Sequence, residues 1–188
     1  MKRCTPRSRR QRKTANKTEI RIGGSGGQGV VLAAQILGKA AVLDGKNAVQ
    51  TQAYGAEARG SLVTSEVIVA EGKIGFPEVR KPDILVAMNQ EVLDKLLKDL
   101  KENGTLIINS SNVATVPESR GKVCRFPMTE TAKKSFGEAI YANMVMLGVF
   151  TKTTRLVTVQ SMEKAIRESV SPETVESDIN AFRNGLKL

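Results

Sequence analysis

Segments with two kinds of apolar pattern alternate along the chain after residue 18. Short apolar or alternating runs predict strands, and stretches in which apolar side chains recur every three or four positions predict helices. The expected strands cover residues 20–23, 47–53, 61–70, 83–88, 105–109 and 122–126. The expected helices cover residues 28–43, 89–100, 130–136, 138–150, 159–170 and a last segment that begins at Pro172. This alternation predicts an α/β fold, a three-layer α/β/α sandwich with a mainly parallel or mixed sheet.

Three of these elements carry a more specific signal. Residues 61–70 alternate in polarity, which predicts a strand with one exposed face. Residues 83–88 form a continuous apolar run, which is typical of strands buried inside parallel sheets. Asn89 follows this run and is a favoured residue at a helix N-cap. We expect a helix to begin after Asn89, and Pro172 to occupy the first turn of the last helix.

The net charge of +10 is concentrated at the N-terminus. The first 18 residues contain eight of the 29 basic residues and no acidic residue, which leaves 21 basic and 19 acidic residues, a net charge of +2, for the rest. We therefore expect residues 1–18 to be a disordered basic arm and residues 19–188 to form a single domain. The arm is compatible with binding of polyanions, with an acidic partner surface, or with a solvated extension of no specific role.

Composition narrows the chemistry that the chain can perform by itself. The chain has no histidine and only two cysteines, Cys4 and Cys124, so it lacks the ligands for a zinc site or an iron–sulfur cluster and the usual acid–base side chain. We expect no metal site and no catalytic residue of its own. No apolar run approaches the length of a membrane helix, and no secretory signal is evident, so we expect a cytoplasmic protein that does not bind membranes.

The segment Gly24-Ser-Gly-Gly-Gln-Gly29 lies between the first expected strand and the first expected helix. Such a turn exposes backbone N–H groups at a helix N-terminus and favours a phosphate, although it also permits close helix–strand packing without any ligand. The spacing matches the dinucleotide fingerprint. However, NAD binding also requires an acidic residue at the end of the second strand, and none occurs there before Glu57. NAD is therefore disfavoured.

A second loop, residues 54–60, follows the second expected strand and is expected at the same sheet edge as the glycine-rich turn. In a ligand-binding interpretation, Arg59 faces an anion above the turn and Tyr54 packs on a flat ligand or partner. In the alternative, the loop is solvated and Glu57 and Arg59 form a weak exposed pair. Later in the chain, Asn143 interrupts an apolar helix and would need a partner if buried, so we expect it to anchor a neighbouring loop.

Four segments, residues 24–31, 51–60, 143–148 and 180–185, together resemble one family. They are similar to the gamma subunits of 2-oxoacid:ferredoxin oxidoreductases, and the form Gln52-Ala-Tyr-Gly-Ala-Glu-Ala-Arg-Gly60 is closest to the 2-oxoglutarate type. The resemblance covers about residues 19–186. The chain departs from the family pattern at Ser61, where a second glycine is usual.

The resemblance implies a hetero-oligomeric enzyme whose alpha, beta and ferredoxin-like delta subunits hold thiamine diphosphate, magnesium and iron–sulfur clusters. The complex would convert a 2-oxo acid and coenzyme A into acyl-CoA (succinyl-CoA from 2-oxoglutarate) and CO2, with electrons passing to ferredoxin. This chain would bind no cofactor alone and would help to form the coenzyme A pocket. That pocket would contain Gly24, Gly26, Gly27, Gln28, Gly29, Tyr54 and Arg59.

Two alternatives from other classes stay open at this point. The first is a stand-alone NAD(P)-binding Rossmann-like protein, based on the glycine spacing alone. The second is a nucleic-acid-binding role for the basic arm, which the nearly neutral remainder of the chain makes less expected.

Overall fold

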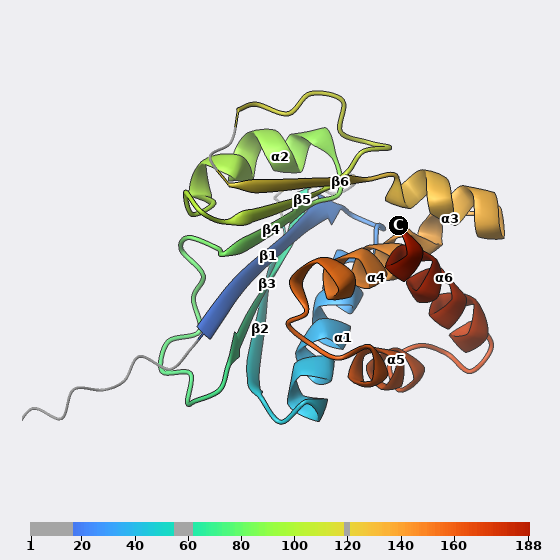
Figure 1. Ribbon diagram of the computed structural model, residues 1–188, viewed down its shortest axis with the longest axis horizontal. Coiled ribbons are helices and arrows are strands. Elements are labelled where there is room, and N and C mark those ends of the chain that lie inside the picture. Colours follow the sequence, from blue (N-terminus) through green and yellow to red (C-terminus); the bar gives the residue numbers. More distant parts are fainter. Residues whose placement is uncertain (1–16, 55–61, 119–120) are drawn as a thin grey trace, which may run out of the picture.

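Six strands form a mixed sheet in the computed structural model, which describes residues 17–54, 62–118 and 121–188 (Figure 1). The strands are β1 (Lys17–Ser25), β2 (Asn47–Tyr54), β3 (Leu62–Ala70), β4 (Ile84–Ala87), β5 (Thr105–Asn109) and β6 (Lys122–Phe126). The α-helices are α1 (Val30–Leu43), α2 (Gln90–Leu96), α3 (Met128–Phe136), α4 (Ala142–Thr154), α5 (Val159–Arg167) and α6 (Val175–Lys187). Single 3-10 turns, η1 (Leu97–Asp99) and η2 (Ala139–Tyr141), extend α2 and precede α4.

The strand order across the sheet is β2-β3-β1-β4-β5-β6. Strands β1, β4, β5 and β6 are parallel, whereas β3 is antiparallel to both of its neighbours, β1 and β2. This arrangement confirms the predicted α/β fold with a mixed sheet. Lys17 pairs with Ala70, so β1 includes Lys17 and Thr18, which the charge pattern had assigned to the arm. Residues 1–16 of the predicted arm lie outside the described residues.

The two faces of the sheet bury different clusters of apolar side chains. Because side chains alternate along a strand, Ile20 and Ile22 face the cluster formed with α1 and α4, while Leu85 and Ala87 face the cluster formed with α2. Figure 1 shows α2 on one face of the sheet and the other α-helices on the opposite face. Helices therefore pack against both faces of the sheet and bury an apolar cluster on each, as in a three-layer sandwich.

Three predicted elements differ from the structure. β3 does not keep an exposed face along its whole length, because the four consecutive residues Val67, Ile68, Val69 and Ala70 are all buried and must be covered on both faces. The predicted helix over 138–150 is divided into η2 and α4. The last helix begins at Val175 rather than at Pro172, because the Thr174 and Val175 amides both donate to the Ser171 carbonyl and close a turn there.

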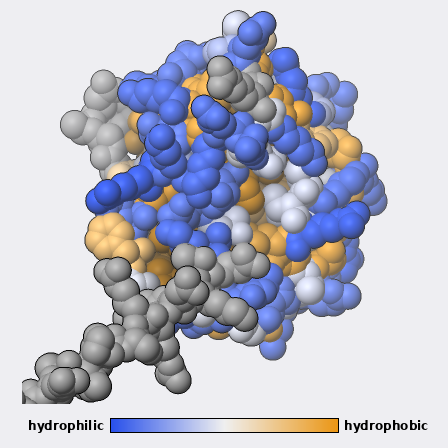
Figure 2. Space-filling view, turned by 60° about the vertical axis from the view of Figure 1, so that its left-hand side comes forward, coloured by the Kyte–Doolittle hydropathy of each residue, from blue (hydrophilic) through white to orange (hydrophobic). Residues whose placement is uncertain are grey.

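The surface carries few large apolar side chains. The exposed ones among the described residues are Val42, Leu43, Phe76, Val123, Ile140 and Val159. Val42 and Leu43 end α1, and the others each come from a different element or connection. Figure 2 shows a mostly polar face on which apolar areas are separate from one another. Within the described residues, no helix combines the length and the apolar character that crossing a membrane requires.

Helices α4 and α6 pack closely because glycines face one another at their contact. A Cβ atom on Gly148 would lie 2.8 Å from both the Gly185 Cα and the Leu186 nitrogen. A Cβ atom on Gly185 would lie 3.0 Å from the Gly148 Cα. Since the obstructing atoms belong to the backbone, no change of side-chain rotamer could accommodate either methyl group. Two of the segments singled out in the sequence, 143–148 and 180–185, thus end in glycines that set the distance between two helices.

We expect Gly148→Ala to lower the free energy of unfolding by roughly 1–3 kcal/mol, because the added methyl group forces two backbones apart. Gly38→Ala is the matched control, since Gly38 lies inside α1 and its Cβ would meet only the Ala48 Cβ, at 4.0 Å. There the higher helix propensity of alanine should stabilise the protein by about 0.5–1 kcal/mol. Urea denaturation of both variants measures the difference. Equal stability of Gly148→Ala and wild type would contradict the account of this contact.

Candidate functional site

Two loops predicted from the sequence leave the same edge of the sheet. Ser25, the last residue of β1, pairs with Leu62, and Tyr54, the last residue of β2, pairs with Val63. The glycine-rich turn and the loop after β2 therefore start at the same end of the sheet, from strands that are separated by β3. Residues 55–61, including Arg59, and the side chain of Tyr54 lie outside the described residues, so the predicted rim of the pocket stays a prediction.

Gln28 closes the glycine-rich turn. Its backbone amide donates to the Ser25 carbonyl at 3.1 Å, and its side-chain Oε1 accepts from the Ser25 amide at 2.7 Å. Gly27 and Gly29 have φ values of 88° and 67°, in the left-handed region that glycine adopts without strain. The side-chain oxygen of Gln28 is therefore used to hold the turn, and any ligand would meet a loop whose shape is already fixed.

Packing requires glycine at some positions of the turn and not at others. A Cβ on Gly24 would lie 2.6 Å from Gln28 Oε1 and 2.7 Å from Val30 Cγ2, so packing excludes a side chain. A Cβ on Gly29 would overlap the side-chain amide of Asn143. Gly26 has no such requirement, because it is exposed, its φ is not in the left-handed region, and its Cβ would have no neighbour within 4 Å. Above Gly26 the turn faces open space.

Asn143 anchors the turn from α4. Its side chain lies against Gly29, and its Oδ1 accepts from the Met144 amide at 2.9 Å. Asn143 is buried, and its contact with the turn is one of packing against Gly29, because the hydrogen bond that its side chain makes lies within α4.

The turn is also tied to the adjacent strand. Asn89 follows β4, which is the parallel neighbour of β1, and its Nδ2 donates to Ser25 Oγ at 2.7 Å. Its Oδ1 accepts from the Val92 amide at 2.9 Å, which confirms Asn89 as the N-cap of α2. After β1 the chain enters α1 on one face of the sheet, and after β4 it enters α2 on the other face (Figure 1). This is a topological switch point, where open α/β sheets bind ligands.

Sequence reasoning missed a polar cluster at the end of β5. Asn109 Nδ2 donates to Thr129 Oγ1 at 2.8 Å, and Asn112 Nδ2 donates to the same oxygen at 3.2 Å. Asn109 is fully buried, and both side chains also approach the Met88 carbonyl oxygen. The run Asn109-Ser-Ser-Asn112 after a predicted strand was the available signal. Because these groups bond to one another, they hold the sheet edge in place beside the turn.

The fold also separates the glycine-rich turn from the end of β2, where a dinucleotide site would need an acidic residue. In Rossmann folds the second strand lies next to the first, so a carboxylate at its end reaches the ribose. Here β3 lies between β1 and β2, which places β2 about 9–10 Å from β1. The interpretation as an NAD(P)-binding Rossmann-like protein is therefore unsupported. No group of three or more histidine, cysteine or acidic residues in the described ranges could hold a metal ion.

A hollow of about 450 Å³ opens beside Asn143, between α4 and α6. Asp178 lines it and is buried, with little compensation for its charge. Burial raises the pKa of the Asp178 carboxyl, and a hydrogen bond with the Thr174 side chain only partly opposes this effect. The remaining wall is largely apolar, with Tyr141, Met144 and Val170.

Comparison with known proteins gives consistent results. The sequence profile of the family described as "Pyruvate ferredoxin/flavodoxin oxidoreductase" matches residues 19–188. The 2-oxoglutarate synthase subunit KorC of Methanocaldococcus jannaschii is 44% identical over 181 residues, which cover 95% of this chain and 97% of that protein.

Two solved structures share the fold. The gamma subunit of a keto/oxoacid ferredoxin oxidoreductase from Geobacter sulfurreducens is 40% identical and superposes with a TM-score of 0.81, covering 90% of this chain and 96% of that chain. A 2-oxoglutarate:ferredoxin oxidoreductase from Magnetococcus marinus superposes with a TM-score of 0.82 at 19% identity, covering 91% of this chain and 30% of that longer chain. The second likeness is one of fold alone.

We expect Asp178→Asn to stabilise the protein at neutral pH. The raised pKa means that the ionised carboxyl disfavours the folded state, so the penalty grows as the pH rises above the ordinary carboxyl pKa of 3.8 and is absent well below it. Urea denaturation near pH 7.5 and near pH 4.5 should give a smaller gain at the lower pH. Glu138→Gln removes an exposed acid from the same hollow and serves as the control, with little expected effect. A gain that does not change with pH would show that charge burial is not its cause.

Proposed function

Because the chain belongs to the pyruvate ferredoxin/flavodoxin oxidoreductase family, we propose that its glycine-rich turn forms one wall of a coenzyme A site. The chain is a subunit of a 2-oxoacid:ferredoxin oxidoreductase. The proposed reaction is the oxidative decarboxylation of 2-oxoglutarate with coenzyme A to succinyl-CoA and CO2. The proposed partners are the alpha, beta and ferredoxin-like delta subunits, with ferredoxin as electron acceptor and the cytoplasm as location.

The observation that carries the proposal is the set of free backbone donors at the turn. The amides of Gly26, Gly27 and Gly29 have no hydrogen-bond partner among the described residues. They lie at the start of α1, where the helix macrodipole places partial positive charge. Phosphate groups of coenzyme A carry the complementary charge and acceptor oxygens.

The start of α1 also lacks the protein groups that normally complete a helix N-terminus. Its N-cap is Gly29, no side chain caps it, and its first turn contains no acidic residue. The side chains of Asn89 and Thr158 cap α2 and α5, whereas α3, α4 and α6 also lack a side-chain cap, and α3 and α6 have acidic residues in the first turn. A bound phosphate would supply the missing acceptor.

In the proposed function, this chain binds coenzyme A and the partner subunits carry out the chemical steps. The turn is held by Gln28 and Asn143, so it can bind and orient a phosphate without rearrangement. Thiamine diphosphate, magnesium and the iron–sulfur clusters would belong to the partner subunits and supply the bond-breaking and electron-transfer chemistry. The choice of 2-oxoglutarate is supported by the name of the relative from Methanocaldococcus jannaschii, 2-oxoglutarate synthase subunit KorC. The choice of coenzyme A is supported by the enzyme of like fold from Magnetococcus marinus, whose structure has coenzyme A bound.

We expect Gly26→Ala to weaken coenzyme A binding by the assembled enzyme about tenfold or more, because a methyl group would occupy the space that the phosphate approaches. The stability of the subunit should stay within about 0.5 kcal/mol of wild type. Gly75→Ala is the matched control: its Cβ also meets nothing within 4 Å, but it lies in the connection between β3 and β4, away from the turn. Calorimetric titration with coenzyme A measures both variants. Unchanged affinity of Gly26→Ala would remove the turn from the site.

We expect Arg59→Ala to reduce coenzyme A affinity about tenfold to a hundredfold, the loss of one charge-assisted contact of roughly 1.5–3 kcal/mol. Arg80→Ala is the control, because Arg80 is exposed and lies over the Phe76 ring in the connection between β3 and β4. The same titration on the assembled complex separates the two. Equal affinities of Arg59→Ala and Arg80→Ala would place Arg59 outside the site while leaving the role of the turn to the Gly26 test.

A further inference from the structure

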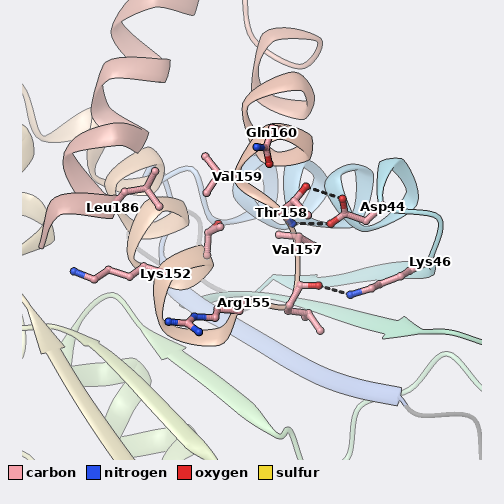
Figure 3. A pocket seen from close by; sticks show the side chains of 11 residues that line it. Asp44, Lys46, Lys152, Arg155, Val157, Thr158, Val159, Gln160 and Leu186 are labelled. Atoms are coloured by element: carbon pink, nitrogen blue, oxygen red, sulfur yellow. Dashed lines mark hydrogen bonds between the residues drawn. The ribbon is translucent and has the colours of Figure 1, made fainter.

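A second hollow, of about 660 Å³, lies at the opposite end of α1 from the glycine-rich turn (Figure 3). Asp44, which follows α1, lines it, together with the last turn of α4, the start of α5 and the end of α6. α1 has 14 residues, so this hollow and the turn are separated by about 21 Å along the helix. Its volume is within the range of about 300–1,000 Å³ typical of small-molecule sites.

Two cations line this hollow without acidic partners. Lys152 and Arg155 come from the end of α4, and neither makes an ion pair or side-chain hydrogen bond with another described residue. Figure 3 shows both side chains extending to the same side of the last helical turn. Lys46 approaches from the other side of the 156–158 segment, and its Nζ donates to the Leu156 carbonyl.

The acid of the hollow does not neutralise these cations. Asp44 is the acidic residue among its lining residues, and its carboxylate accepts from the Thr158 amide and the Thr158 hydroxyl, each at 2.7 Å, and from the Ser161 hydroxyl at 2.6 Å. Burial opposes its ionisation, but these hydrogen bonds outweigh it and hold the pKa of Asp44 below its usual value. The Asp44 carboxylate thus holds the start of α5 through hydrogen bonds. The lining has one acidic residue and three basic residues, Lys46, Lys152 and Arg155, so its net charge is positive.

The backbone of Arg155 has an uncommon conformation. Arg155 has a φ of 52°, and it is the one non-glycine residue with positive φ in the described ranges. Its amide donates to the Thr151 carbonyl at 2.9 Å and ends α4, a position that usually contains glycine or asparagine. A basic residue there interacts favourably with the helix C-terminus, but the guanidinium makes no hydrogen bond to the last carbonyls. It is free to bind an anion.

The start of α5 adds further donors and an apolar wall. The amides of Val159 and Gln160 have no partner among the described residues, as expected in the first turn of a helix. Leu156, Val159 and Leu186 provide apolar lining, and the Val159 side chain is unusually exposed for its type. The hollow thus combines an anion-attracting side with an apolar side.

We propose that this hollow is a second ligand site, which binds a small phosphate ester with an apolar body through Lys152, Arg155 and the first amides of α5. The site is independent of the proposed coenzyme A site. Arginine and lysine supply charge-assisted bonds to the phosphate, and the aliphatic side chains cover the apolar part.

The test uses hexyl phosphate as the probe. Inorganic phosphate is the control for the phosphate group alone, and hexanol is the control for the apolar body alone. Titration of the full-length, nitrogen-15-labelled chain is followed by the amide signals of Val159 and Gln160 and, separately, by those of Gly26, Gly27 and Gly29. We expect saturable shifts at Val159 and Gln160 with hexyl phosphate, tighter than with inorganic phosphate, and no saturation with hexanol. Shifts confined to the glycine-rich turn, or no saturation at α5, would overturn the proposal.

Arg155→Gly and Lys152→Gln should each weaken hexyl phosphate binding about tenfold or more. Glycine suits the backbone at 155, so that variant should fold as well as wild type, and Lys152→Gln supplies a second, independent substitution. Lys164→Gln, on the exposed side of α5, is the charge-matched control and should bind as wild type does. All variants retain the basic arm, so its contribution to anion binding cancels. Wild-type affinity in both site variants would overturn the proposal.

Discussion

The structure depends on close packing at glycine positions where no side chain fits. Gly29 receives the side chain of Asn143, and this contact fixes the start of α1 against the start of α4. Five residues further along α4, Gly148 meets Gly185 and fixes α4 against α6. The glycine-rich turn is thus connected through one helix to the last helix of the chain, and its shape is set by packing before any ligand binds.

This constraint explains why the turn is suited to binding. Gln28, Asn89 and Asn143 use their side chains to hold the loop, while the amides of Gly26, Gly27 and Gly29 remain without partners among the described residues. A preformed set of donors loses little conformational entropy when an anion binds. In the proposed function, the turn positions a substrate for cofactors that the partner subunits hold.

The sequence pattern predicted those elements that interactions between neighbouring residues determine. The buried run at 83–88 became β4, and Asn89 caps α2, because apolar continuity and capping are encoded by neighbouring residues. The position of β3 between β1 and β2 was not predictable in this way, because pairing between distant strands leaves no periodic signal. Lys17 and Thr18 resembled a polar arm but pair with Ala70 and Val69, and the start of α6 at Val175 depends on a turn that the proline pattern did not reveal. The glycine-rich turn was found from spacing, whereas its tie to Asn89 through Ser25 required the fold.

The central claim is that the glycine-rich turn binds the phosphates of coenzyme A in the assembled enzyme. The most direct test is a cryo-electron microscopy structure of the complete complex with coenzyme A bound, at a resolution that places phosphate oxygens. The account predicts a phosphate oxygen within about 2.7–3.2 Å of the backbone nitrogen of Gly26, Gly27 or Gly29. Coenzyme A bound with its phosphates elsewhere, and the turn in contact with solvent or protein only, would contradict it.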